Sequence, residues 1–418
     1  MKPPRLKNDC FALPPGVHWT PVDHALDRLR GILHPVTGTE TLTLMNAARR
    51  FISQPIQAKR SNPPHANSAV DGYGFAHAST GRGPQILPLM PGRIAAGALL
   101  GQQVPKGHAV RILTGAPLPE GVDTVILQED VTAEPDRIAF HGGLKPGANT
   151  RRAGEDVTAG DVILQAGIRL RPAELAILAA TGMQHVETFC QLRVGVLSTG
   201  DELSEAGQTA TDSQIYDANR PMLLSLIAQW GYAPVDLGHV PDDRDALRTR
   251  LDDAANKTDV ILTSGGASAG DEDHVSALLT ETGSAEIWRI AIKPGRPLAL
   301  GLWQGVPVFG LPGNPVAAMV CTLIFAAPAF RVLAGGAWQQ PQGFMAPAAF
   351  AKTKKSGRRE YLRARLDENG AVQVFQSEGS GRISGLAWAD GLVELGDGAA
   401  LIEPGDMVRY IPFHSFGT

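Results

Sequence analysis

Cysteine is scarce in this chain of 418 residues, which contains only Cys10, Cys190 and Cys321. The three lie far apart and match neither a zinc-ligand spacing nor a disulfide framework. Their scarcity disfavours a metal-thiolate site and a disulfide-stapled secreted domain. We therefore expect free thiols in a reducing compartment, which favours a cytoplasmic location.

The chain also has little net charge and no long apolar run, and no secretory leader is expected. Forty-two acids against 38 bases give a net charge of −4, with no long run of Lys or Arg, so we expect no nucleic-acid partner. The segment MKPPRLKNDCF has no apolar core and is not expected to be a secretory signal. The longest apolar stretch, residues 316–327, is too short to span a bilayer and predicts a buried helix. A small-molecule partner and no membrane partner are expected.

Glycine and proline, by contrast, are plentiful, with 47 and 31 residues, and they predict many short, shaped loops. The length suits two to four domains, and 43% hydrophobic residues suffice for several cores. The pattern of residues 21–33 predicts an amphipathic helix, and a second helix is expected at 42–51. Short β-like runs at 109–113 and 124–128 predict a mostly β module within 61–150.

From residue 192 the pattern alternates between strands and helices up to about residue 335. The expected elements are strands at 192–198, 235–240, 259–264, 286–292 and 306–310, and helices at 218–230, 243–255, 274–282 and after Pro315. This alternation is typical of a doubly wound, largely parallel sheet. Residues 340–418 return to short strands at 361–366, 371–375 and 407–411, which predict a β barrel or sandwich.

Three glycine-rich loops follow predicted strands: STGDEL (198–203), SGGASAGDED (264–273) and GLPGNP (310–315). The carboxyl edge of an open α/β sheet is where ligands bind. Glycine lets backbone amides approach an anion closely, and each loop leads toward a helix start that favours negative charge. We therefore expect these loops to bind a phosphate-bearing ligand. The expected ligand-binding residues are Thr199, Gly200, Asp201, Ser264, Gly265, Gly266, Gly270, Pro312, Gly313 and Asn314.

The same loops carry five acids: Asp201, Glu202, Asp271, Glu272 and Asp273. These carboxylates would repel a phosphate unless a divalent cation such as Mg²⁺ lay between them. For any one of them, a helix cap is about as good an explanation. None of the loops has the dinucleotide-binding or P-loop spacing, which disfavours a Rossmann dehydrogenase.

A basic pair, Lys293 and Arg296, flanks the turn of IKPGRP and would suit a small oxyanion. A solvated surface turn is the alternative. In the β module, Asp71 precedes Gly72 and Thr114 precedes a glycine-containing turn, and both segments are equally consistent with simple turns. The cluster RRAGEDV (151–157) is consistent with an ion-pair network.

Taken together, seven segments closely resemble the molybdopterin molybdenumtransferase (MoeA) family, which is similar to the C-terminal part of gephyrin. The segments are NSAVDGYG, RILTGAPLPEGVDTVILQE, RRAGEDV, STGDEL, SGGASAGDED, IKPGRPLALG and GLPGNPVAA. They occur in the family's order over nearly the whole chain. The last eighty residues or so are weakest, with only GRREYLRARL and EGSGRISGL recognisable.

The resemblance implies insertion of molybdate into adenylylated molybdopterin, with Mg²⁺-dependent hydrolytic release of AMP. It implies an elongated homodimer, with possible transient contacts to molybdopterin adenylyltransferase and apo molybdoenzymes. It also implies an α/β multidomain fold with a discontinuous domain (1–55 and 151–190), an inserted mostly β domain (56–150), a doubly wound central domain (191–336) and a C-terminal β domain (337–418).

Residue roles are likewise carried over by motif. The resemblance places Asp71, Thr114, Glu202, Asp242 and Asp273 at or near the active site. Of these, Asp242 and Asp273 are the candidate metal ligands, and Asp71 is expected to come from the partner subunit. The molybdate candidates are Ser268, Lys293, Arg296, Arg358 and Ser380. Arg296 departs from the family's usual Lys, which keeps the charge but alters the pocket geometry.

Two other functions remain open. A molybdopterin adenylyltransferase would share the strand-end loops, but a single-domain enzyme of that kind would lack residues 61–150. A pterin-binding scaffold or carrier would not need the four acids Asp71, Glu202, Asp242 and Asp273. Tungstate in place of molybdate is also open, because both are tetrahedral dianions of similar size.

Overall fold

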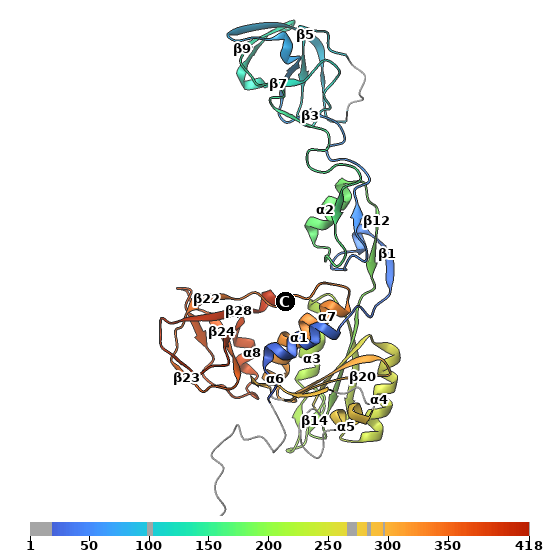
Figure 1. The fold of residues 1–418 in the computed structure, drawn as a ribbon, viewed down its shortest axis with the longest axis vertical. Helices are drawn as coiled ribbons and strands as arrows, with labels where there is room; N and C mark the ends of the chain where they lie inside the picture. The colour runs from blue at the N-terminus through green and yellow to red at the C-terminus, as the bar shows by residue number, and fades with distance from the viewer. Residues whose placement is uncertain (1–18, 98–102, 266–273, 282–285, 296, 418) are drawn as a thin grey trace, which may run out of the picture. The chain divides into compact units, whose positions relative to one another are not determined.

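The computed structural model describes residues 19–97, 103–265, 274–281, 286–295 and 297–417. The chain divides into two compact units, each considered by itself (Figure 1). The larger unit comprises residues 1–40 and 189–418, and the smaller unit comprises residues 41–188. The candidate loops after residue 190 all belong to the larger unit.

The larger unit contains a mixed sheet flanked by helices and a separate set of C-terminal strands. Its elements are α1 (Val22–Ile32), β13 (Arg193–Thr199), β14 (Leu203–Ser204), β15 (Ile215–Tyr216), α3 (Asn219–Gln229), β16 (Ala233–Val240), α4 (Arg244–Lys257), β17 (Val260–Ser264), α5 (His274–Glu281), β18 (Glu286–Arg289), β19 (Ile292–Lys293), β20 (Pro297–Trp303), β21 (Val306–Leu311), α6 (Pro315–Cys321), η4 (Thr322–Ala326), α7 (Ala327–Leu333), β22 (Phe344–Pro347), β23 (Lys352–Lys354), β24 (Arg359–Leu366), β25 (Val372–Val374), α8 (Ser384–Trp388), β26 (Gly391–Leu395), β27 (Ala400–Ile402), β28 (Met407–Pro412) and η5 (Phe413–Phe416).

The sheet has the order β16-β13-β17-β21-β20-β18. The run from β16 to β21 is parallel, while β20 and β18 are antiparallel to their neighbours. The predicted doubly wound, mostly parallel sheet is therefore confirmed. Strand β20 was not predicted, because it begins at the last residue of the IKPGRP turn and has no turn residues that mark it off.

Helices cover both faces of this sheet. Helices α4 and α5 lie on one face, where Leu251 and Leu278 pack with Leu197 of β13 and Val308 of β21. Successive strand residues point to opposite faces, so Phe309 packs on the other side, edge to face with Phe330 of α7. Figure 1 shows α3 and α7 on the side of β20 away from α4. Because helices cover both faces of the sheet, a ligand can reach it only at the ends of its strands.

The predicted apolar helix after Pro315 runs as one helical stretch from Pro315 to Leu333 through the π-helical segment η4. Pro328 does not end it, since the wider π turn just before Pro328 accommodates the missing amide hydrogen. By length and composition alone the stretch could cross a membrane, but 78% of its most apolar window is buried inside the fold. It is a core helix of the larger unit.

The predicted opening helix is confirmed as α1, whose buried face is Val22, Ala25, Leu26 and Leu29. Its N-terminal end is held by Asp23, which accepts two hydrogen bonds of 2.7 Å from the guanidinium of Arg359 in β24. The guanidinium donor holds the pKa of Asp23 below its usual value. Sequence positions 23 and 359 are thereby joined.

The C-terminal strands form a sheet of order β19-β24-β26-β28-β22, with β25 paired to β24, and a short ladder of β23 with β27. Their core includes Leu362, Ala364, Val393 and Tyr410. Strand β19 precedes β20 in the chain, yet it pairs with β24, where Lys293 lies opposite Glu360. This pairing brings the IKPGRP turn to the C-terminal strands.

The smaller unit is mostly β. Its elements are β1 (Thr39–Thr43), η1 (Leu44–Asn46), β2 (Ile56–Gln57), β3 (Asn67–Ser68), β4 (Gly72–Phe75), η2 (His77–Ser79), β5 (Pro84–Ile94), β6 (Ala109–Ile112), β7 (Thr124–Leu127), η3 (Gln128–Asp130), β8 (Val131–Ala133), β9 (Arg137–His141), β10 (Thr150–Arg151), β11 (Val162–Leu164), α2 (Pro172–Ala180) and β12 (His185–Phe189). The main sheet has the order β7-β4-β6-β5-β9-β8.

The helix predicted at residues 42–51 is wrong. The chain there forms β1, which pairs with β12, and a single 3₁₀ turn, η1. Leu42, Leu44 and Ile52 pack against Leu178 of α2, a helix that the sequence analysis did not predict. The apolar spacing suited a helix, but pairing with a distant strand decided the local structure.

Candidate active site

Asn219, the first residue of α3, joins two of the predicted loops. Its Nδ2 donates to Ser264 Oγ at 2.8 Å and to the carbonyl oxygen of Gly313 at 2.6 Å. The ends of β17 and β21 are thus held to one side chain, which is only 7% exposed. Asn219 is not among the predicted site residues. The available signal in the sequence is a polar residue at the start of an apolar helical segment.

Asp217 holds Asn219 in place. One oxygen of its carboxylate accepts from the amides of Asn219 and Arg220, each at 3.1 Å, and so caps the first turn of α3. Arg220 in turn pairs with Glu205 at 2.7 Å and with Asp236 at 3.1 Å. The position of Asn219, which joins the two strand ends, is therefore stabilised by a network of charged side chains.

Glycine is required where the first two predicted loops approach each other. Gly265 has a φ of +98°, and a Cβ at this position would lie 2.5 Å from the carbonyl oxygen of Thr199. Its amide donates to Leu311 at 3.2 Å, which ties it to the third strand. Thr199, Gly200, Ser264, Gly265 and Gly313 are therefore brought to one edge, as the sequence predicts.

Several buried polar atoms at this edge have no hydrogen-bond partner among the described residues. They are the hydroxyls of Ser198, Thr199 and Thr263 and the Oδ1 of Asn219. Buried polar groups are nearly always paired in folded proteins, so a group of them at one strand edge points to a polar ligand.

Asp201 and Asp242 are also brought together. The amide of Asp201 donates to Asp242 Oδ2 at 3.2 Å, and the amide of Asp242 donates to Asp201 Oδ1 at 3.0 Å. Glu202 is exposed, and its carboxylate folds back over Gly200, where a Cβ would lie 2.3 Å from Oε2. The three carboxylates share the edge with the buried hydroxyls.

These oxygen donors are of the type that Mg²⁺ prefers, but they do not form a closed cage. Within the described ranges, no group of three or more His, Cys, Asp or Glu side chains is suited to hold a metal ion. Mg²⁺ commonly takes one or two carboxylates together with substrate phosphates, which fits this edge better than an all-protein site.

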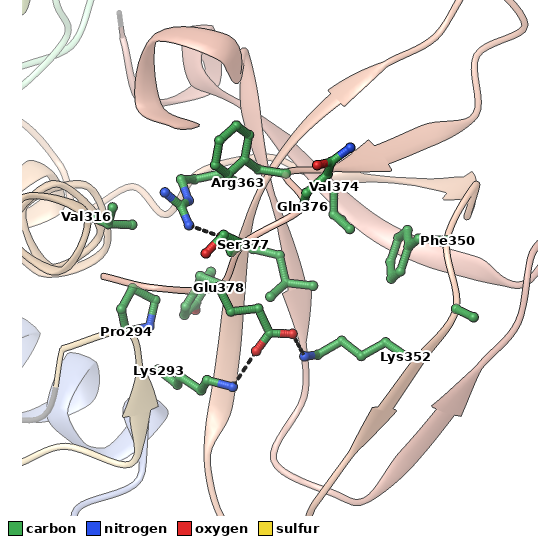
Figure 2. A pocket seen from close by; sticks show the side chains of 14 residues that line it. Lys293, Pro294, Val316, Phe350, Lys352, Arg363, Val374, Gln376, Ser377 and Glu378 are labelled. Atoms are coloured by element: carbon green, nitrogen blue, oxygen red, sulfur yellow. Dashed lines mark hydrogen bonds and ion pairs between the residues drawn. The ribbon is translucent and has the colours of Figure 1, made fainter. Parts of the chain in front are cut away.

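A second candidate site lies at the junction with the C-terminal strands, where a pocket of about 160 Å³ is lined by Lys293, Lys352, Arg363, Ser377 and Glu378, among others (Figure 2). Burial raises the pKa of Glu378, but hydrogen bonds from Lys293 and Lys352 outweigh it and hold the pKa below its usual value. The carboxylate is therefore ionised at neutral pH, and the pocket holds charges of both signs.

Arg363 is the residue of this pocket that the sequence analysis missed. It is 4% exposed, lies over the ring of Phe375 and donates to the carbonyl oxygens of Ser377, Gly379 and Arg382. Among the described residues no ion pair involves it, and burial lowers the pKa of its guanidinium. A buried cation bonded to backbone carbonyls raises the positive potential beside Lys293. Arg363 lies on β24, where consecutive residues are buried, so an alternating apolar pattern could not show that its side chain is buried.

The predicted oxyanion residues are only partly brought together. Lys293 lines the pocket, whereas Arg358 does not. The carbonyl oxygen of Ser380 accepts from the amide of Val316 at 3.1 Å, so the Ser380 loop meets the start of α6 just after Pro312, Gly313 and Asn314. The remaining predicted site residues, Gly266, Ser268, Gly270, Asp271, Glu272, Asp273 and Arg296, lie outside the described residues.

In the smaller unit, Asp71 and Thr114 are hydrogen-bonded to each other, a contact that the sequence did not predict. Thr114 donates to Asp71 Oδ1 from its amide at 2.7 Å and from its hydroxyl at 2.6 Å. The hydroxyl bond, followed by the amide bond, lowers the pKa of Asp71. Gly72 is fixed beside them, since a Cβ there would lie 1.9 Å from the carbonyl oxygen of Ile126.

Comparisons with known proteins give one consistent family. Residues 20–182 match the MoeA N-terminal region (domain I and II), residues 195–332 match a probable molybdopterin binding domain, and residues 345–413 match the MoeA C-terminal region (domain IV). A molybdopterin molybdenumtransferase of Haemophilus influenzae is 37% identical over 94% of this chain and 98% of its own length. One of Nostoc is 33% identical over 88% of this chain and 87% of its own.

Solved structures agree with the sequence relatives. The crystal structure of a molybdopterin biosynthesis MoeA protein from Pyrococcus horikoshii OT3 has a TM-score of 0.82 at 28% identity, covering 95% of this chain and all of its own. The predicted α/β multidomain class with a β-rich C-terminal part is therefore confirmed. This chain belongs to the molybdopterin molybdenumtransferase family, whose members act in molybdenum cofactor biosynthesis.

Proposed function

We propose that this protein inserts molybdate into adenylylated molybdopterin, with hydrolysis of the adenylyl bond and release of AMP. The observation that carries the proposal is the pairing of two different polar sites in one unit. One is the strand edge with its unpartnered buried hydroxyls, and the other is the cationic pocket around Lys293. A large phosphate-bearing substrate and a small oxyanion need separate sites of these two kinds.

At the strand edge, the proposed work of the chain is to bind and orient phosphates. Backbone amides of the loops that begin at Thr199, Ser264 and Pro312 would face them, with Asn219 keeping the loops in register. We propose Asp242 and Asp273 as the residues that hold Mg²⁺, with Glu202 and Asp201 beside them. Bound there, Mg²⁺ would neutralise charge on the phosphates.

At the pocket, Lys293 is the proposed molybdate ligand, with Arg296, Ser268 and Ser380 around it. Arg358 is also a candidate, but we prefer Arg363 because it is a lining residue of the same pocket and Arg358 is not. The contact between Ser380 and Val316 places this pocket next to the loop that carries Gly313. Molybdate would therefore be held near the substrate that accepts it.

Asp71 and Thr114 are proposed to take part as well, through a carboxylate that stays ionised at neutral pH. A homodimer, a cytoplasmic location and transient contacts with molybdopterin adenylyltransferase and apo molybdoenzymes complete the proposal. We also propose a division into a discontinuous domain (1–55 and 151–190) and domains at 56–150, 191–336 and 337–418.

The direct test mixes purified protein with adenylylated molybdopterin, Mg²⁺ and molybdate, and follows AMP release and activation of an apo molybdoenzyme. We expect AMP release to require both molybdate and Mg²⁺. Formation of adenylylated molybdopterin from molybdopterin and ATP would instead identify an adenylyltransferase. Binding of the pterin with no turnover under any of these conditions would identify a carrier.

A further inference from the structure

Four charged side chains alternate in sign at the Lys293 pocket. Lys293, Lys352 and Glu378 line the pocket, and Glu360 contacts both lysines from outside the lining. Lys293 lies 2.6 Å from Glu378 Oε2 and 3.5 Å from Glu360 Oε1. Lys352 lies 3.1 Å from Glu360 Oε2 and also contacts Glu378 Oε1. Figure 2 shows the Glu378 carboxylate between the two ammonium groups. Each oxygen of the Glu378 carboxylate therefore forms an ion pair with one of the two lysines.

The two carboxylates differ in how firmly they are held. The side chain of Glu360 is 10% exposed and belongs to β24, where it pairs in register with Lys293. The side chain of Glu378 is 45% exposed and belongs to the loop between β25 and α8. Moving Glu360 out would disrupt a strand, whereas moving Glu378 requires only a change at an exposed loop side chain.

The charge balance depends on Glu378. With it in place, the two lysines and two glutamates sum to zero, and the net positive charge of the pocket comes from Arg363. Without it, these four positions carry one positive charge in addition to that of the buried Arg363, so the net positive charge rises from one to two. Lysine ammonium groups with few remaining partners are strong donors to an oxyanion.

We propose that Lys293 and Lys352 together form an oxyanion site, and that the Glu378 carboxylate is its internal occupant, displaced when a tetrahedral dianion binds. The inference rests on the proposed function, which supplies the dianion, and it adds two residues to that site. A carboxylate presents two oxygens to the two lysines, and a tetrahedral oxyanion can present two of its four oxygens in the same way.

The displacement proposal predicts in which direction anion binding changes when each charge is removed, and this direction differs from that expected of a purely structural network. If the four charges only stabilise the fold, loss of any one of them weakens the pocket. If Glu378 competes with the ligand, its removal strengthens binding while removal of Lys352 weakens it. The two residues would then have opposite effects on the same binding constant.

The test measures molybdate binding by equilibrium dialysis and the molybdate concentration for half-maximal AMP release. We expect Glu378→Gln to lower both about 3- to 10-fold, and Lys352→Met to raise both about 10-fold or more. Lys352→Arg should recover part of the loss because it keeps the charge. Glu368→Gln and Lys355→Met, which alter exposed residues outside the pocket lining, serve as matched controls and should change neither value.

Each outcome separates the two proposals. Weaker binding in both Glu378→Gln and Lys352→Met would overturn displacement, and so would no change in either while Lys293→Ala loses binding. In both cases the proposed function stands. A wild-type protein that neither binds molybdate nor releases AMP in response to it would overturn the proposed function itself. Thermal unfolding of each variant shows whether it is folded, and if Lys352→Met is not, the direction of the Glu378→Gln effect decides.

Discussion

The side-chain amide of Asn219 donates to the carbonyl oxygen of Gly313 across 94 positions of sequence, at 2.6 Å. The same nitrogen donates to Ser264, so one side chain sets the spacing of two strand ends. The amide of Gly265, which donates to Leu311, links the same two strand ends through the backbone.

Asn219→Asp is expected to break the Asn219–Gly313 hydrogen bond while nearly preserving the side chain's shape. A carboxylate cannot donate to Gly313 and would be buried, so we expect a loss of about 2–4 kcal/mol in unfolding free energy and slower AMP release. Urea unfolding and the AMP assay measure the two effects. Asn369→Asp, at an exposed side chain in the turn after β24, is the control and should change stability by less than about 0.5 kcal/mol. Wild-type stability of Asn219→Asp would show that the loops are held by other contacts.

Gly265→Ala tests the close approach of two loops. The added Cβ would meet the carbonyl oxygen of Thr199 at 2.5 Å and would also be strained by the φ of +98°. Gly305→Ala is matched to it, with a φ of +84° and nothing within 4 Å. We expect the control to lose about 1 kcal/mol from backbone strain alone and Gly265→Ala to lose about 2 kcal/mol or more. Equal losses in urea unfolding would mean that the Thr199 loop moves aside freely.

Thr114→Val tests the cause of the lowered pKa of Asp71. The variant removes the hydroxyl donor but keeps the amide, so the pKa should rise part of the way toward its usual value. Carboxyl-detected NMR titration of the protein follows Asp71 directly. Thr80→Val, whose hydroxyl donates to His77 instead, should leave the Asp71 titration unchanged. An unshifted curve in Thr114→Val would assign the effect to the amide alone.

The Asp23–Arg359 contact should make stability depend on pH in the acid range. The folded pKa of Asp23 is lowered, so its contribution is fully present above the unfolded value of 3.8 and is lost as pH falls through the folded value. Because Asp23 is 62% exposed, the contribution is expected to be below about 1 kcal/mol. Asp23→Asn should thus lower stability slightly at pH 7 and not at all at the acid end. A constant difference between the two proteins across the titration would contradict this origin.

Asp273→Ala tests the proposed phosphate chemistry. We expect the variant to fold and to bind adenylylated molybdopterin but to release AMP at least about 100-fold more slowly. Asp212→Ala is the control, since it alters an exposed acid of the larger unit. Single-turnover measurements separate binding from hydrolysis. A wild-type rate would remove Asp273 from the mechanism.

Local patterns predicted the elements whose own residues decide their structure. The helix at residues 21–33 and the β-α alternation after residue 192 were predicted because apolar spacing there agrees with the buried faces that formed. The helix at 42–51 failed because pairing of β1 with β12, far away in sequence, outweighed the local spacing. The same limit applies to the site. The sequence alone identifies Gly265 and Gly313 as residues of glycine-rich loops. Asn219, Lys352 and Glu378 can be recognised as site residues only from contacts with residues that are distant in the chain.

The segment from Gly313 to Val316 contacts both candidate sites at its two ends. The carbonyl oxygen of Gly313 receives Asn219 at the strand edge, and the amide of Val316 donates to the Ser380 loop beside the Lys293 pocket. Between them, Pro315 fixes the first turn of α6. An insertion or deletion of one residue here would shift one site relative to the other without altering a single lining side chain. A change in the length of this segment should therefore disturb both sites at once, whereas a substitution at one of its positions should affect mainly the nearer site.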